Sequence, residues 1–113
     1  MVDFEIYKQN EKQAYKLQKK HGLTETLRDL YAWEVLTADE VVNLQEYKNR
    51  VQPEYTGNYE TDKLLAEAFT KKITAMNLTE SVLTDICAKE LYESGCLELH
   101  EAFELQRFRT LLS

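Results

Sequence analysis

The two histidines are the residues whose chemistry is simplest to examine in this sequence. His21 ends a lysine-rich segment, where the negative end of a helix dipole would stabilise an imidazolium. His100 and Glu104 are four residues apart, so on a helix both side chains face the same way and could contact one metal ion. A metal site needs at least three converging ligands, and the nearby sequence offers no third. We therefore predict no metal and no cofactor, and place His100 on a solvated polar face.

Catalytic motifs are not recognisable in the chain. No local Ser/His/Asp arrangement stands out, and no glycine-rich phosphate loop of the P-loop or dinucleotide type is present. Carboxylates are abundant, but Glu67 with Lys71 and Asp85 with Lys89 have the i, i+4 spacing of solvated helix faces. We predict that the protein is not an enzyme. An enzyme whose carboxylate-based site is assembled from distant residues is kept as the second alternative.

A helix-turn-helix DNA-binding regulator is the first alternative, because residues 79–112 have that general form with Gly95 in the turn. The second helix carries its charges in two blocks, acidic at Glu98, Glu101 and Glu104 and basic at Arg107 and Arg109. The acidic block lies where base-contacting residues would be, and it repels phosphate. The net charge of −6 also argues against a large nucleic-acid footprint.

Aromatic residues are the best candidates for contacts with a partner. They are enriched at protein interfaces, although they also fill small helical cores. Tyr55 and Tyr59 bracket the turn-forming pair Gly57-Asn58, where exposure is expected. The complete set of predicted partner contacts is Trp33, Tyr55, Tyr59 and Phe103.

Bulk composition favours one helical domain over residues 1–113. Hydrophobic residues make up 43% of the chain, and one proline and three glycines are too few for a turn-rich β protein. Cys87 and Cys96 lie outside any CxxC pair and are read as small apolar residues. The N-terminus lacks the pattern of a signal peptide, and no apolar run reaches the ~18 residues of a membrane span. We expect a cytoplasmic protein without membrane contact.

Helix start and stop signals divide the chain into six segments. Helices are predicted over residues 3–21, 25–35, 38–51, 62–76, 80–93 and 97–112, with Asp3, Thr24, Thr37, Thr61 and Thr79 as the N-caps of the first five. Tight turns separate most of them, and one longer loop is expected near residues 52–60. Residues 62–76 show the cleanest amphipathic pattern.

Thr37-Ala38-Asp39-Glu40 has the sequence of a capping box, with Leu36 and Val41 placed as a hydrophobic staple. It predicts a sharp corner between two helices, the first ending near Val35. Trp33 lies off the apolar stripe of that first helix, so we expect the last helix, or else a second chain, to cover it.

Residues 23–27 and 78–82 resemble each other at an offset of 55, Leu-Thr-Glu-Thr-Leu against Leu-Thr-Glu-Ser-Val. A duplicated helix-turn-helix unit would explain this resemblance. Good helix starts also resemble one another because they reuse the same capping chemistry, and we favour that explanation.

Together these patterns predict an all-α fold, a compact bundle of five or six short helices. The leading functional hypothesis is a protein–protein interaction module, such as an adaptor, an inhibitor or an assembly subunit. Its partner would be another protein or a second copy in a dimer, because the second and last helices are apolar on more than one side.

Overall fold

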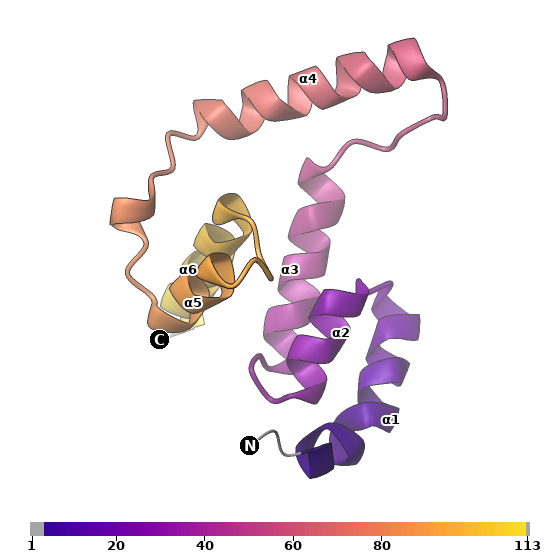
Figure 1. Cartoon of the computed structure of the whole chain (residues 1–113), viewed down its shortest axis with the longest axis vertical. Helices are drawn as coiled ribbons and strands as arrows, with labels where there is room; N and C mark the ends of the chain where they lie inside the picture. Colours follow the sequence, from indigo (N-terminus) through magenta and orange to yellow (C-terminus); the bar gives the residue numbers. More distant parts are fainter. Residues whose placement is uncertain (1–3, 113) are drawn as a thin grey trace.

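A computed structural model describes residues 4–112, and it confirms the all-α prediction (Figure 1). The described chain forms six α-helices and one 3₁₀ turn: α1 (Phe4–His21), α2 (Glu25–Ala32), α3 (Ala38–Val51), α4 (Tyr59–Ala75), η1 (Glu80–Val82), α5 (Ile86–Glu93) and α6 (Leu99–Leu112). The predicted cap Asp3 lies outside the described residues. No helix among them is both long enough and apolar enough to cross a membrane.

The corner between α2 and α3 contains the predicted capping box. The Glu40 N–H donates to the Thr37 hydroxyl at 3.2 Å, and the Glu40 carboxylate accepts from the Thr37 N–H at 2.9 Å. However, α2 ends at Ala32 rather than near Val35. Glu34 adopts the left-handed conformation (φ 60°), and the N–H groups of the next two residues donate back to the Leu30 carbonyl, which closes the helix earlier.

Two predicted helix starts are wrong. α4 begins at Tyr59, because Asn58 rather than Thr61 is its cap, and Tyr59 therefore belongs to the helix and not to the loop. Thr79 precedes only η1 and makes no capping hydrogen bond. α5 starts later, where the Asp85 carboxylate accepts from the N–H of Ala88 at 2.9 Å. The chain therefore has a second long connection, residues 76–85, besides the expected one before α4.

The buried core lies among α2, α3, α5 and α6. Its members are leucines with a few smaller apolar residues: Leu23, Leu27, Leu30, Leu36, Val41, Leu44, Leu83, Ala88, Leu91, Leu97, Ala102 and Leu105. Most of them occupy equivalent positions in two helix pairs, α2 with α3 and α5 with α6, so the core consists of two similar halves.

Those helix pairs form a structural duplication. α2 and α5 each have 8 residues, α3 and α6 each have 14, and a five-residue corner joins each pair. We call residues 24–51 repeat 1 and residues 85–112 repeat 2; equivalent positions differ by 61, as Glu25 and Ile86 show at the helix starts. A duplicated helix pair therefore explains the resemblance better than the repeated use of similar capping residues. The offset between the two copies is 61 residues, and the offset of 55 is wrong.

Hydrogen bonds repeat at the same offset. In repeat 1 the Gln45 side-chain oxygen accepts from the Thr24 N–H at 3.0 Å, and in repeat 2 Gln106 accepts from the Asp85 N–H at 2.8 Å. Each glutamine thus fastens the start of the short helix to the long one. The corners match as well, since Gly95 (φ 84°) takes the place of Glu34.

α4 lies outside this core, and its amphipathic pattern, predicted to be the cleanest in the chain, is weaker than those of α1, α2, α3 and α5. None of its residues is buried, and Leu64 is 67% exposed. Figure 1 shows α4 along one side of the molecule, joined by extended connections at both ends. The Cα radius of gyration is accordingly 15.5 Å, against roughly 13 Å for a compact domain of this length.

Candidate functional site

The two repeats meet through α3 and α6, and two ion pairs cross this interface reciprocally. Arg109 of repeat 2 pairs with Glu40 of repeat 1, and Lys48 of repeat 1 pairs with Glu101 of repeat 2 at 2.7 Å. These are equivalent residues at the 61-residue offset, so the same contact is made twice about a pseudo-twofold axis. The two carboxylate side chains are only 8% and 4% exposed.

Electrostatics favour the ionised form of the Glu40–Arg109 pair. Burial opposes the ionisation of Glu40, but hydrogen bonds from Arg109 and from the Thr37 N–H outweigh it, so the pKa of Glu40 is lowered. The hydrogen bond to Glu40 in turn raises the pKa of Arg109 against the effect of burial. The pair therefore stays charged at neutral pH and fixes the two repeats relative to each other.

This interface also uses the helices that a helix-turn-helix protein would insert into DNA. α3 and α6 are the second helices of their pairs, and one face of each packs on the other. Glu101 and Glu104 near the start of α6 are buried.

His100 is buried, at 4% exposure, and the prediction of a solvated face is wrong. Its Nδ1 lies 2.9 Å from the Tyr47 hydroxyl, and its Nε2 lies 2.8 Å from the Glu98 carboxylate. Burial, followed by the nearby Glu104 and Glu101, raises the pKa of Tyr47, so the phenol keeps its proton. Because the Glu98 carboxylate accepts, Nε2 is the donor in that contact, and in the neutral imidazole Nδ1 then accepts from the Tyr47 hydroxyl.

The sequence missed a cluster of three metal-type ligands around this histidine. Ligand atoms of Glu98, His100 and Glu101 lie within 4.8 Å of one another. However, one Glu101 oxygen accepts from the Glu98 N–H, and the other lies 2.7 Å from the Lys48 ammonium. A bound cation would have to displace that ammonium, so we interpret the cluster as a structural polar network.

Glu104, which the sequence spacing places on the same helix face as His100, has other partners. Glu104 accepts two hydrogen bonds from Arg107, at 3.1 and 2.8 Å, and a longer one from Asn43. Glu104 therefore contributes hydrogen bonds to the α3–α6 interface and does not contact the His100 imidazole.

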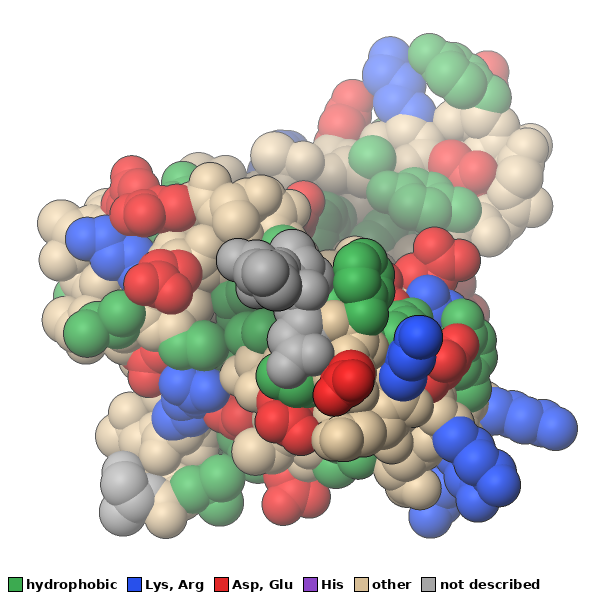
Figure 2. Space-filling model, turned by 60° about the horizontal axis from the view of Figure 1, so that its bottom comes forward, with side chains coloured by type: hydrophobic (Ala, Val, Ile, Leu, Met, Phe, Trp, Pro, Cys, Tyr) green, Lys and Arg blue, Asp and Glu red, His purple; other side chains and the backbone are tan. Residues whose placement is uncertain are grey.

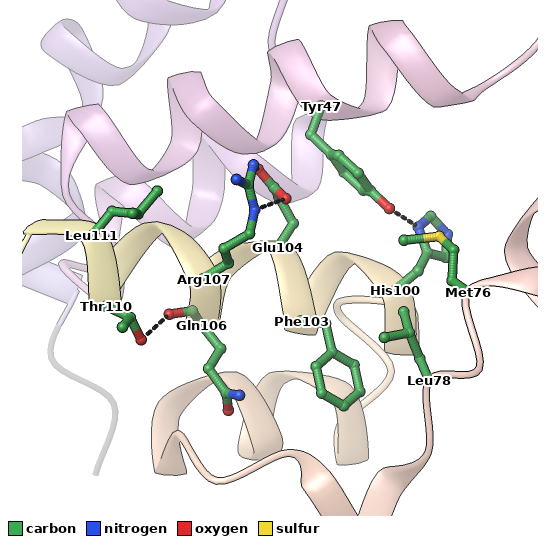
Figure 3. A pocket seen from close by; sticks show the side chains of 10 residues that line it. All are labelled: Tyr47, Met76, Leu78, His100, Phe103, Glu104, Gln106, Arg107, Thr110 and Leu111. Carbon is green, nitrogen blue, oxygen red and sulfur yellow. Dashed lines mark hydrogen bonds and ion pairs between the residues drawn. The ribbon is translucent and has the colours of Figure 1, made fainter.

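An open pocket lies beside this network and is the best candidate for a binding site. We call it the docking groove; its volume is about 410 Å³, and it lies among α3, α6 and the start of the 76–85 connection (Figure 3). Apolar side chains form most of its wall: Met76, Leu78, Phe103 and Leu111. Tyr47 and His100 line its inner part, and Arg107 adds a charge. It can hold an apolar group with a polar edge.

The predicted partner contacts do not form one surface. Phe103 lines the docking groove, whereas Tyr55 and Tyr59 lie at the distant start of α4, 59% and 79% exposed. Met76 and Leu78 were not among the predicted contacts. No local signal marks them, because only the path of the 76–85 connection brings them to α6.

Trp33 lies elsewhere again and is partly buried by α1. Its ring centroid is 5.8 Å from that of Phe4 and 5.2 Å from that of Tyr7. The expectation that the last helix covers Trp33 is wrong. The chain reverses direction at Gly22, so α2 runs back along α1. This brings Trp33, at the end of α2, to the first helix.

Comparisons of the chain with protein-family models, with curated proteins and with solved structures find no match. Interpretation of the docking groove therefore depends on its own geometry.

Proposed function

We propose that the protein is a protein-interaction module and that the docking groove receives an apolar side chain of another protein. The observation that carries this proposal is the exposed apolar wall at the edge of repeat 2. Leu111 is 71% exposed there, and Met76 is also exposed. Apolar pockets of this kind are where interface anchors bury most of their surface.

The equivalent place in repeat 1 supports this interpretation. A pocket there is lined by Asp39 and Val42, which correspond to His100 and Phe103, and α1 supplies Leu17 to it. Repeat 2 has Phe103 where repeat 1 has Val42, and the larger side chain makes the repeat 2 pocket more apolar. One member of a duplicated pair thus has the composition of a binding surface.

The surface around the groove fits a protein partner. Apolar and charged side chains also alternate over the face of the molecule that Figure 2 brings forward. Such mixed surfaces resemble interfaces between soluble proteins, with an apolar centre and a polar rim. Arg107, whose side chain is 61% exposed, would select an acidic residue beside the apolar anchor.

Site-specific photo-crosslinking in the native cell tests the proposal. A photoreactive residue replaces Leu111 at the groove, and the matched control carries it at the exposed Lys12 on α1. A discrete protein adduct is expected at position 111 alone, and Phe103→Glu should abolish it. Equal adducts at both positions, or an adduct that survives Phe103→Glu, would contradict docking at the groove.

A further inference from the structure

The outer face of α5 lacks the cover that α2 has. In repeat 1, α1 lies along α2: the Tyr7 hydroxyl donates to Asp29 at 3.3 Å, and the Asn10 amide donates to the Ala32 carbonyl at 3.0 Å. In repeat 2 the corresponding face is open, because Glu90 and Glu93, the equivalents of Asp29 and Ala32, are both exposed. A helix is therefore present over one short helix and missing over its counterpart.

α4 is the counterpart of α1 in sequence position. The offset of 61 relates the buried Ala14 and the half-buried Leu17 to Ala75 and Leu78. A small residue and a leucine thus lie at the same distance before each repeat. Yet α4 ends at Ala75, and Asn77 (φ 51°) and η1 turn the chain, so α4 leaves repeat 2 while α1 stays on repeat 1 (Figure 1).

The charges of α4 and α5 are complementary in this arrangement. Asn10, which contacts the carbonyl of Ala32, corresponds to Lys71, and Ala32 corresponds to Glu93. A helix seated on α5 as α1 is seated on α2 would therefore place Lys71 beside Glu93. Lys72 and Glu90 are the exposed neighbours of this pair, with the same signs.

We propose that α4 of a second copy of this chain covers α5 as α1 covers α2, and that the exchange is reciprocal. Two copies then form a symmetric dimer, because each chain provides one helix and one open face. The inference rests on the proposed function only in treating the chain as an interaction module. It uses the outer face of α5, not Phe103 and its groove.

Charge reversal in the full-length protein tests this dimer. Variant K carries Lys71→Glu and Lys72→Glu, and variant E carries Glu90→Lys and Glu93→Lys. Sedimentation equilibrium should show a dimer for the wild type and a roughly 10- to 100-fold weaker dimer for each variant alone, because both contacts then join like charges. A control with Lys8→Glu and Lys12→Glu on α1 makes the same change in net charge and should dimerise as the wild type does.

Mixing the two variants identifies which chain supplies the helix. In the mixed dimer one contact has both charges reversed and the other has the native charges, so variants K and E together should form a heterodimer of wild-type strength. Circular dichroism should show unchanged helix content in each variant.

Three results would overturn the proposal: a wild-type monomer, a dimer that neither variant weakens, or recovery only when all four substitutions are in one chain. The last result would mean that α4 closes on its own α5. A dimer that behaves as predicted without a crosslink at position 111 would instead contradict the proposed function alone.

Discussion

Removal of Lys48 from the repeat interface provides the most direct test of the structure. The Lys48 ammonium lies 2.7 Å from a Glu101 carboxylate whose side chain is only 4% exposed. Lys48→Met retains most of the aliphatic stem and removes the charge. Glu101 is then left buried with the hydrogen bond from the Glu98 N–H but without a cation.

The expected loss of stability follows from this burial. Breaking a buried ion pair by removing one partner costs about 3–5 kcal/mol, because the remaining charge is desolvated without compensation. With a urea m-value of about 1–3 kcal/mol/M for a small protein, the unfolding midpoint should fall by roughly 1–5 M. Adding Glu101→Gln should recover much of the loss, since an amide oxygen can still accept from the Glu98 N–H and carries no charge.

Urea unfolding followed by circular dichroism measures these differences, and a double-mutant cycle isolates the coupling between the two residues. The control Lys12→Met, at an exposed position of α1, should leave the midpoint nearly unchanged. A loss below about 1 kcal/mol for Lys48→Met would show that the pair behaves as a surface salt bridge. In that case the Lys48–Glu101 pair does not hold the two repeats together.

Two further predictions concern the other repeat contact and the duplicated corner. The pKa of Glu40 is lowered in the folded protein, so its contribution to stability is present above its unfolded pKa of about 4.3 and is lost as pH falls through the lower folded value. Glu40→Gln should therefore flatten the acid limb of a stability–pH curve. An unchanged limb would contradict the pairing with Arg109. Gly95→Ala should cost about 1–2 kcal/mol in urea unfolding because Gly95 has a φ of 84°, whereas Glu34→Gly at the equivalent corner should relieve left-handed strain, and equal destabilisation by both changes would contradict the match.

Local capping chemistry made much of the helix pattern predictable. The bounds of α3 agree with the prediction at both ends, because the Thr37 box starts the helix and the residue before Pro53 cannot continue it. Errors arose where two good caps compete within a few residues. Asn58 and Asp85 act as caps instead of Thr61 and Thr79, and this choice depends on the path of the preceding chain.

The candidate site was only partly accessible to sequence reasoning. Phe103 was found because it lies off the main apolar stripe of its helix, which marks a second contact surface. Met76 and Leu78 were missed because they approach α6 only through the turn at Asn77. The prediction that α4 is the most amphipathic helix is wrong, and periodicity did not show that its Phe69 ring would lie 5.9 Å from the ring of His100.

The sequence by itself determined the class of fold and most helix ends, because hydrogen bonds between residues three or four positions apart decide them. Tertiary structure alone decided that α3 packs on α6, that His100 is buried and that α4 is left uncovered. Those outcomes depend on contacts such as Glu40 with Arg109 and Tyr47 with His100, which join residues more than fifty positions apart. At that separation the energy of a contact depends on how the whole chain folds back, and no local pattern of residues encodes it.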